Sequence, residues 1–241
     1  MADPSPAPLI GRWRGRWPYQ EALAAQRQFR ERRQRGEERD ELWLLEHDAV
    51  ITTGRRPVPD LPDETQLQGS GFSLVHTERG GLATAHEPGQ LVGYLLMDAG
   101  PLGPERVVHA VEAALIGWLA SYGLAADRRP GLPGVWLPAT GGRVSKIAAV
   151  GLHFRAGFTL HGFALNLRND LRGFGLITPC GVHEGGVTSL LAELNAAPTP
   201  AEAAVPVGAA VAQALGRPFE VESEHSRLAT LNVLDRVRTH E

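Results

Sequence analysis

The sequence predicts a single α+β domain. Short strand-like runs dominate residues 41–97 and recur at 146–167, and helical patterns lie between and after them. The chain has 241 residues, of which 43% are hydrophobic, so it is long enough to bury one well-formed core. No internal repeat or interdomain linker is visible. We therefore expect one domain over residues 11–241, preceded by a disordered, Pro-rich segment at residues 1–10.

The first hundred residues predict one helix followed by short strands. Residues 19–35 carry apolar side chains at helical spacing, and arginines crowd the rest of that surface. A Pro-rich loop is expected at residues 54–71, and the Gly-rich stretch 79–89 is expected to be a polar loop between two paired strands. The expected strands are residues 41–46, 50–52, 72–77 and 90–97.

The second half predicts a long helix, a hairpin and further helices. Residues 104–122 begin with proline and repeat apolar side chains at helical spacing, which predicts a helix. After a Pro/Gly-rich connector at 129–142, the runs 146–154 and 159–167 predict a hairpin around residues 155–158. The remaining chain predicts helices near residues 187–194, 201–215 and 224–238, and a short strand near 218–221.

Composition excludes several classes of partner. With 24 Lys+Arg against 27 Asp+Glu the net charge is -3, so no global basic field favours nucleic acid. The single cysteine cannot form an intrachain disulfide and fits a reducing compartment. The N-terminus lacks the pattern of a signal peptide, and no stretch approaches the roughly 18 apolar residues of a membrane span. We expect a cytoplasmic protein that binds neither nucleic acid nor membrane.

One lysine and one cysteine stand out in this composition. Lys146 is the single lysine among 24 basic residues, and the other 23 are arginine. A desolvated lysine can lose its proton, whereas arginine effectively cannot. The lone thiol, Cys180, and this lysine therefore suggest a nucleophile and the cation or proton carrier that activates it. The alternative for Cys180 is a small buried hydrophobic residue. The alternative for Lys146 is a strand-end lysine whose side chain reaches to solvent, but arginine would serve there equally well.

Four stretches carry residue types suited to binding or catalysis. Residues 79–90 read RGGLATAHEPGQ, in which adjacent glycines let backbone amides approach a ligand. The alternative is an ordinary β-turn whose histidine has its hydrogen bonds satisfied within the fold. The stretch is not a P-loop, because no Gly-Lys-Ser/Thr closes it. In the stretch that contains the Cys180 thiol, Gly181 leaves the thiol accessible and offers a backbone N–H that could stabilise an oxyanion. The other three stretches are SKIAAVG at 145–151, HGFALN at 161–166 and PCGVH at 179–183.

Other chemistries have weaker support. A Cys/His protease is the obvious competitor, but no cysteine-protease signature surrounds the thiol. No metal site is expected, because His76 and His86 stand ten residues apart and no Cys pair, HExxH or His-x-His cluster is present. The basic helix is either a solvated face or a docking surface for an acidic protein. Its arginines are Arg27, Arg30, Arg32, Arg33 and Arg35.

Together the four stretches resemble the octanoyltransferases of lipoate biosynthesis over residues 40 to 195 or so. The sequence departs from the family pattern at Glu87, where a small residue is common, and at residues 138–142, which lengthen the turn before the lysine. The Glu-His and Gly-Arg pairs at 46–47 and 54–55 also fit. The residues that carry the resemblance are Arg79, Gly80, Gly81, Thr84, His86, Pro88, Gly89, Gln90, Tyr94, Lys146, Ile147, Gly151, His161, Gly162, Leu165, Asn166, Pro179, Cys180 and Gly181.

The resemblance implies a fold, a reaction and a set of partners. The fold is the α+β domain of lipoate- and biotin-protein ligases, with a mixed, largely antiparallel sheet flanked by helices. Cys180 would take the octanoyl group from octanoyl-acyl carrier protein, with Lys146 lowering the thiol pKa. The acyl group would pass to a lysine on lipoyl domains of 2-oxoacid dehydrogenase E2 subunits or on the glycine cleavage H protein, as the first step of endogenous lipoylation.

The resemblance also implies a substrate-binding set. No ATP, other cofactor or metal is required, because the thioester is already activated, and a monomer is expected. An ATP-dependent ligase on the same fold is the runner-up, but its Gly-Arg-Gly-Arg-x-Gly motif is missing. A non-catalytic acyl- or lipoyl-domain-binding protein is the third possibility. The implied substrate-binding residues are Arg79, Gly80, Gly81, Leu82, Ala83, Thr84, Ala85, His86, Ala149, Val150, Gly151, His161, Gly162, Phe163 and Ala164.

Overall fold

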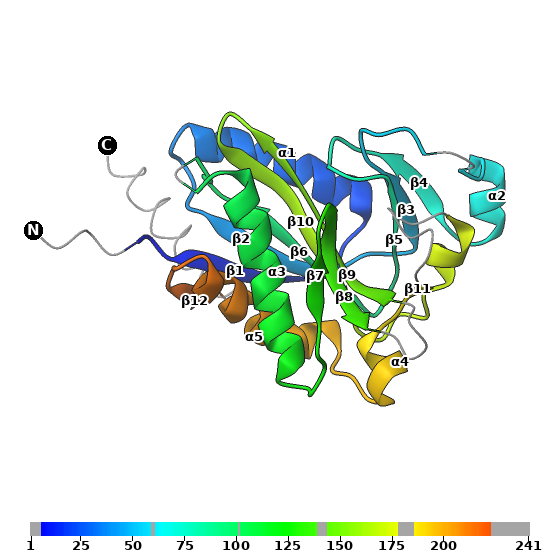
Figure 1. Ribbon diagram of the computed structural model, residues 1–241. Helices are drawn as coiled ribbons and strands as arrows, with labels where there is room; N and C mark the ends of the chain where they lie inside the picture. The colour runs from blue at the N-terminus through cyan, green and yellow to red at the C-terminus, as the bar shows by residue number, and fades with distance from the viewer. Residues whose placement is uncertain (1–5, 59–60, 101, 139–143, 178–185, 223–241) are drawn as a thin grey trace, which may run out of the picture.

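A large β-sheet forms the centre of the molecule. The computed structural model describes residues 6–58, 61–100, 102–138, 144–177 and 186–222. The strands of the sheet are β1 (Leu9–Arg16), β2 (Glu41–Glu46), β6 (Gln90–Leu96), β7 (Asp127–Arg129), β8 (Leu132–Pro138), β9 (Val144–Arg155), β10 (Phe158–Asn166), β11 (Gly186–Val187) and β12 (Phe219–Val221). Their order is β12-β1-β2-β6-β10-β9-β8-β7, and β11 pairs with β9 (Figure 1).

The sheet is mixed and largely antiparallel, which confirms the predicted fold class. Strands β2, β6, β10, β9, β8 and β7 run alternately antiparallel. Parallel pairing occurs at β1 with β2 and β12, and between β9 and β11. The predicted hairpin is present, because β9 and β10 pair from Phe158↔Arg155 to Leu165↔Ala148. Strand β11 then takes the place beside β9 at Ser145 and Lys146, beyond the end of β10.

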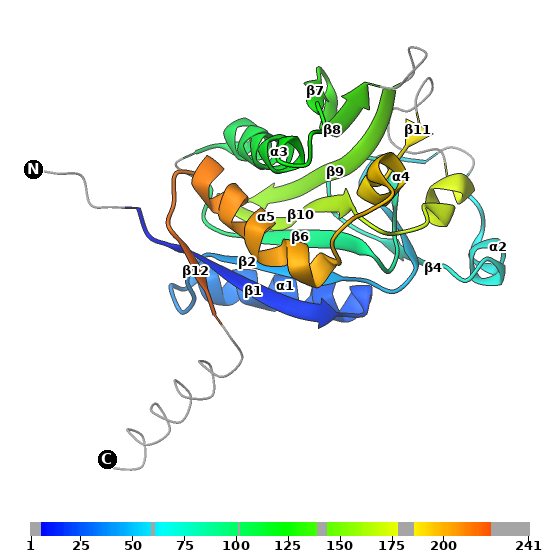
Figure 2. The same ribbon diagram turned by 90° about the horizontal axis from the view of Figure 1, so that it is seen from below.

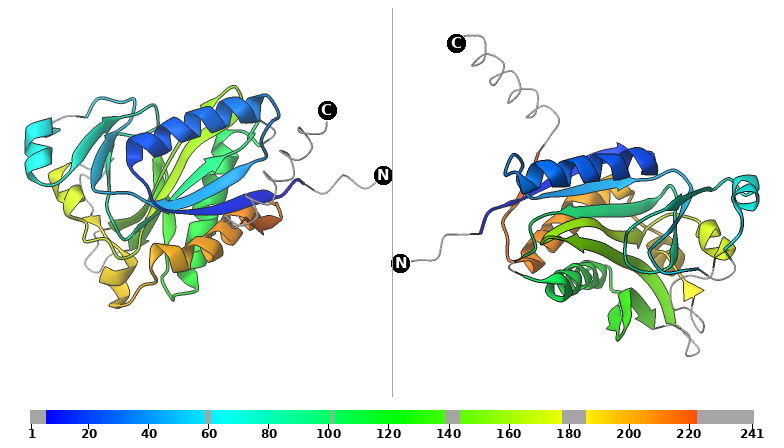
Figure 3. Two further views of the ribbon diagram at one scale, coloured as in Figure 1. Left: turned by 180° about the vertical axis from the view of Figure 1, so that it is seen from behind. Right: turned by 90° about the horizontal axis from the view of Figure 1, so that it is seen from above.

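Helices cover both faces of this sheet. Helix α3 (Pro104–Ala120) and helix α5 (Pro200–Ala214) pack against each other on one face, as Figure 2 shows. Helix α1 (Tyr19–Gln34) lies across the other face and contacts β10 and β6 (Figure 3). All three were predicted, and each buries the apolar stripe that its sequence pattern indicates. At the start of α5, a Thr199 and Glu202 capping box satisfies the first backbone N–H groups.

A second, three-stranded sheet stands beside the large one. It has the order β4-β3-β5, formed by β3 (Val50–Thr53), β4 (Ser73–His76) and β5 (Ala83–His86). The prediction that residues 72–77 and 90–97 pair with each other is wrong, because β4 and β6 belong to different sheets. The predicted loop at 79–89 contains β5, which pairs with β3. Helix α2 (Glu64–Gly69) and the 3₁₀ helix η1 (Arg172–Leu176) lie at this end of the molecule (Figure 1).

Several expected boundaries are also corrected. Helix α2 interrupts the loop expected at 54–71, because Asp63 and Gln66 form a capping box. The connector expected at 129–142 contains β8, and the helix expected near 187–194 is α4 (Leu190–Leu194). The disordered segment expected at 1–10 is wrong at Leu9 and Ile10, which are buried in β1.

Two remaining features concern the whole described chain. The short strand expected near residues 218–221 is β12, whereas the helix expected at 224–238 lies outside the described residues. Within the described ranges, every helix is too short or too polar to cross a membrane.

Candidate active site

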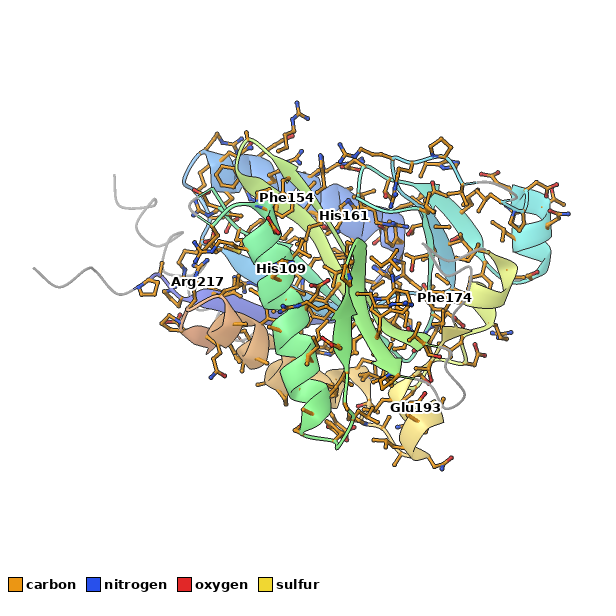
Figure 4. The ribbon with its side chains drawn as sticks, in the orientation of Figure 1. His109, Phe154, His161, Phe174, Glu193 and Arg217 are labelled. Carbon is orange, nitrogen blue, oxygen red and sulfur yellow. The ribbon has the colours of Figure 1, made fainter. Side chains whose placement is uncertain are left out.

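A cavity of about 320 Å³ opens beside the β9–β10 hairpin. It collects residues from β5 and the loop before it, from β6, β9 and β10, and from the start of β8 and the residue before it. His161 on β10 and Phe174 on η1, both labelled in Figure 4, contribute to its wall. Its lining includes apolar side chains such as Val92, Val150 and Phe163. A cavity with an apolar lining and a few polar groups is typical of a small-molecule site.

The structure brings together most residues of the predicted site. Ala85 does not line the cavity: it is fully buried with Ile51 and Phe72 in the core of the small sheet. Cys180 lies outside the described residues. The predicted residues that do line the cavity are Arg79, Gly80, Gly81, Leu82, Ala83, Thr84, His86, Lys146, Ala149, Val150, Gly151, His161, Gly162, Phe163 and Ala164.

Arg79 holds the Gly-rich loop against the small sheet. Its guanidinium donates hydrogen bonds to the Thr52 carbonyl oxygen at 2.6 Å, to Thr52 Oγ1 at 3.0 Å and to the Gly80 carbonyl oxygen at 2.9 Å. The Gly80 amide in turn approaches the Leu152 carbonyl oxygen of β9 at 3.4 Å. The loop is thereby tied to β3 on one side and to β9 on the other. This explains why a buried arginine begins the motif.

His86 is the first member of a buried hydrogen-bond chain. Gln90 Nε2 donates to the Ala85 carbonyl oxygen at 3.2 Å and to Asn166 Oδ1 at 2.8 Å. Gln90 Oε1 is therefore left to accept from His86 Nδ1, 2.8 Å away. Burial is the main reason why the pKa of His86 lies well below 6.5. The imidazole is neutral at neutral pH, with its Nε2 lone pair available.

The chain continues to the segment that follows the undescribed residues 178–185. Asn166 Nδ2 donates to the Thr188 carbonyl oxygen at 2.9 Å, and the Thr188 amide donates to the Lys146 carbonyl oxygen at 3.0 Å. Just before Thr188, β11 pairs with Ser145 and Lys146. Gln90 and Asn166 are among the residues that carry the family resemblance, but the sequence alone predicts no role for either. Their role comes from tertiary contacts that the sequence alone does not show.

Lys146 lies at the cavity wall, largely out of solvent. Its side chain is 8% exposed. Nζ donates to the Pro133 carbonyl oxygen at 3.1 Å and lies 4.6 Å from the centre of the Trp136 ring, a cation-π distance. Gly134 makes this packing possible, because a Cβ there would lie 2.5 Å from the Ala148 carbonyl oxygen and 3.1 Å from Lys146 Cε. The ammonium is thus placed by three residues of β8.

His161, which lines the cavity, carries backbone strain. It has φ +62 inside a β-strand, a conformation that is uncommon for a residue other than glycine. Among the described residues neither ring nitrogen has a hydrogen-bond partner, although Glu78 Oε2 lies 4.0 Å from Nε2. Burial lowers the pKa of His161 to about 3. Gly162, the next residue, is required because a Cβ there would lie 2.1 Å from the Gly93 carbonyl oxygen.

A buried tyrosine of the cavity lining contacts a buried histidine outside the lining. Tyr94 lines the cavity, and its hydroxyl lies 2.5 Å from His47 Nε2. His47 Nδ1 must donate to the Trp17 carbonyl oxygen, 2.6 Å away, so Nε2 accepts from Tyr94. Burial lowers the pKa of His47 to about 4 and raises that of Tyr94 well above 10. Neither residue was predicted to bind substrate, although both fall in stretches that carry the resemblance.

Comparison with known proteins identifies relatives of the whole domain. The lipoyl protein ligase A/B catalytic domain family matches residues 18–212. An octanoyltransferase from Mycolicibacterium gilvum is 44% identical over 210 residues, covering 86% of each chain. An octanoyltransferase from Chloroflexus aurantiacus is 41% identical over 220 residues, covering 89% of this chain and 96% of that protein.

Solved structures give the same fold at much lower identity. A bipartite lipoate protein ligase from Thermoplasma acidophilum superposes with a TM-score of 0.68 at 17% identity, covering 95% of this chain and 92% of that one. A lipoate-protein ligase A bound with ATP gives 0.66 at 17% identity, with coverages of 95% and 94%. A biotin protein ligase from Aquifex aeolicus gives 0.52 at 11% identity, with coverages of 86% and 70%. These structures support the fold alone.

Proposed function

Because this chain belongs to the octanoyltransferase family and is an acyltransferase, we propose that it transfers an octanoyl group from octanoyl-acyl carrier protein to lipoyl domains. The acceptor is the ε-amine of a lysine on E2 subunits of 2-oxoacid dehydrogenases or on the glycine cleavage H protein. The observation that carries the proposal is the placement of the single lysine. Lys146 lies at the wall of an apolar cavity that the other motif residues also line.

The first half-reaction forms an acyl-enzyme on Cys180. The thiolate attacks the carbonyl carbon of the carrier thioester, a new C–S bond forms, and the bond to the carrier sulfur breaks. The neutral amine form of Lys146 takes the proton of the Cys180 thiol, and the departing carrier thiolate then takes up that proton from the Lys146 ammonium. Support comes from the chain path, because Gly186, six residues after Cys180, pairs with Ser145 next to Lys146.

The second half-reaction forms the amide. The neutral ε-amine of the acceptor attacks the acyl-enzyme carbonyl, a C–N bond forms and the C–S bond to Cys180 breaks. Lys146 passes one proton from the attacking nitrogen to the departing sulfur. Such a relay needs a group that exchanges protons, which lysine does and arginine does not. This supplies a chemical reason for a single lysine in a chain with 23 arginines.

The cavity suits a medium-length acyl chain. Burial of about six methylenes at ~0.8 kcal/mol each contributes roughly 5 kcal/mol, which is enough to favour octanoyl over acetyl groups. Small residues line the β9–β10 part of the wall, including Ala149, Gly151 and Ala164, and leave room for the chain. Arg79, His86 and His161 supply its polar groups.

The experiment that tests this proposal compares two sources of the acyl group. The full chain is incubated with an apo lipoyl domain and either octanoyl-acyl carrier protein without ATP or free octanoate with ATP and Mg²⁺. We expect octanoylation of the domain only in the first mixture. Transfer only from free octanoate with ATP would show a ligase and overturn the proposal. Binding of the carrier without any transfer would indicate a non-catalytic protein.

A further inference from the structure

A cationic cleft lies next to the cavity and has no part in the chemistry described above. The cleft, about 620 Å³ in volume, is lined by side chains from α1, from the segments after β3 and β4, and from the end of β9. Figure 4 labels Phe154, which stands between two of these residues on β9. The lining residues are Arg27, Arg30, Glu31, Arg55, His76, Thr77, Glu78, His153 and Arg155.

Among the residues that the structure describes, the charges of the cleft are only partly compensated. Arg27 donates two hydrogen bonds to the Glu78 carboxylate, at 3.0 and 2.8 Å, so the charges of these two side chains compensate each other. Three arginines, Arg30, Arg55 and Arg155, then face a single further carboxylate, that of Glu31. Within the described ranges, Arg30 Nη1 is buried and has no hydrogen-bond partner. The excess positive charge therefore favours an anionic partner.

Arg30 also differs from the other arginines of α1. Burial and the nearby positive charge of Arg155 lower the pKa of Arg30 from its usual value. The other four arginines that the sequence places on the basic face have carboxylate partners within the chain. Those pairs are Arg27–Glu78, Arg32–Glu38, Arg33–Asp40 and Arg35–Glu37. The surface suited to an anionic partner is thus the cleft around Arg30 rather than the whole helix.

The cleft and the cavity share a wall. Arg55 lines the cleft, and its neighbour Arg56 lines the cavity. Likewise Glu78 lines the cleft, and its neighbour Arg79 lines the cavity. Across this wall, His161 in the cavity lies 4.0 Å from Glu78 in the cleft. A protein bound over the cleft therefore stands next to the cavity that holds the acyl chain.

The position of the cleft fits a donor whose reactive group reaches away from its folded part. His153 in the cleft is seven residues from Lys146 along β9, which corresponds to about 23 Å at 3.3 Å per residue. The carrier presents its thioester on a long, flexible prosthetic arm, so its folded part can lie over the cleft while the thioester approaches Lys146.

We propose that the cleft formed by Arg30, Arg55, Arg155 and His153 is the docking site for an acidic surface of the acyl carrier protein donor. This inference rests on the proposed function. Carboxylates of the carrier enter the cleft, which speeds encounter and makes it sensitive to salt. The lipoyl-domain acceptor approaches by a different surface.

The test reverses two charges of the cleft and varies the donor. The double variant R30E/R155E is compared with R35E/R39E, which reverses two exposed arginines outside the cleft and changes the net charge equally. Steady-state rates are measured at low ionic strength with octanoyl-acyl carrier protein and with octanoyl-pantetheine, which has neither protein nor phosphate. The lipoyl domain is varied in a separate series.

The cleft variant should raise KM for octanoyl-acyl carrier protein about tenfold with little change in kcat. KM for octanoyl-pantetheine and for the lipoyl domain should stay within about twofold of wild type, as should all constants of R35E/R39E. An equal rise in both double variants, a rise with octanoyl-pantetheine, or a rise confined to the lipoyl domain would overturn the docking site. If wild type forms no acyl-enzyme from either donor, the proposed function itself is wrong.

Discussion

At the scale of single residues, the surroundings of Lys146 connect composition with chemistry. The ammonium is enclosed by the Pro133 carbonyl oxygen, the Trp136 ring and the backbone at Gly134. This enclosure holds the amino group at the cavity wall. The ability to exchange a proton favours lysine at a position where the rest of the chain would use arginine.

We predict that Lys146→Arg loses octanoyl transfer almost as completely as Lys146→Ala. An arginine restores the positive charge but cannot carry a proton between sulfur and nitrogen, since its pKa stays above 12. The matched control is Arg129→Lys, because the Arg129 guanidinium lies over the same Trp136 ring at 5.6 Å. Single-turnover rates should fall at least about a hundredfold in both Lys146 variants and change little in the control. Activity of Lys146→Arg within a few-fold of wild type would reduce Lys146 to a counter-charge.

At the scale of elements, the end of β10 positions the segment that returns from residues 178–185. Asn166 accepts from Gln90 and donates to Thr188, whose amide is bound to the Lys146 carbonyl oxygen. One buried amide thus connects β6 to the residue that directly follows β11. An amide is suited to this position because it offers a donor and an acceptor at once.

The corresponding prediction concerns Asn166→Asp. The aspartate keeps the oxygen that accepts from Gln90, but it replaces the Asn166 Nδ2 group with a second oxygen. The buried Thr188 carbonyl oxygen therefore loses its hydrogen-bond donor. We expect stability to fall by about 1–3 kcal/mol in urea unfolding and kcat to fall at least about tenfold. Asn195→Asp, on the exposed end of α4, is the control and should change neither. Wild-type kcat in a folded Asn166→Asp protein would show that the amide does not position the site.

Local signals explain which elements could be predicted from sequence. Helix α3 and the β9–β10 hairpin follow from periodicity and turn residues, which act over a few neighbouring positions. Strand β5 was missed because its partner, β3, lies some thirty residues away, and because its own sequence is short and consists mostly of small residues. Helix α2 was missed because the prolines around it outweighed the capping box of Asp63 and Gln66.

The same limit applies to the site. The motif blocks identified fifteen residues that line the cavity, because each block is contiguous in sequence. Tyr94, His47 and the link from Gln90 to Asn166 depend on contacts between strands that are far apart in the chain. Periodicity gives no information on such contacts. The assignment of Cys180 remains a prediction, since it lies outside the described residues.

At the scale of the whole molecule, buried titratable groups should control stability against pH. The pKa of His47 is lowered to about 4 and that of His161 to about 3 by burial, so their contributions are present above pH 6.5 and are lost as pH falls. The contribution of Glu87 to stability depends on pH in the opposite direction. Burial, together with the hydrogen bond and charge of Asp170, raises its pKa to about 7, so its contribution is present below pH 4.5 and is lost as pH rises through 7.

We therefore predict that Glu87→Gln changes the pH profile of Tm. The glutamine cannot ionise, so the variant should match wild type near pH 4.5 and gain in Tm relative to wild type as pH rises to 7.5. Glu105→Gln, at an exposed position on α3, is the control and should show a constant difference. Melting curves of the three proteins from pH 4.5 to 8 give the comparison. A Tm difference for Glu87→Gln that does not grow with pH would contradict the raised pKa.

In the proposed mechanism, Cys180 carries the octanoyl group between donor and acceptor. Intact-protein mass spectrometry and peptide mapping after incubation with octanoyl-acyl carrier protein, without ATP or acceptor, would detect this acyl-enzyme. We predict one octanoyl group on Cys180 that disappears when a lipoyl domain is added, and no transfer by Cys180→Ser. An unmodified Cys180 in a protein that still octanoylates the domain, or near wild-type turnover by a folded Cys180→Ser variant, would contradict the claim.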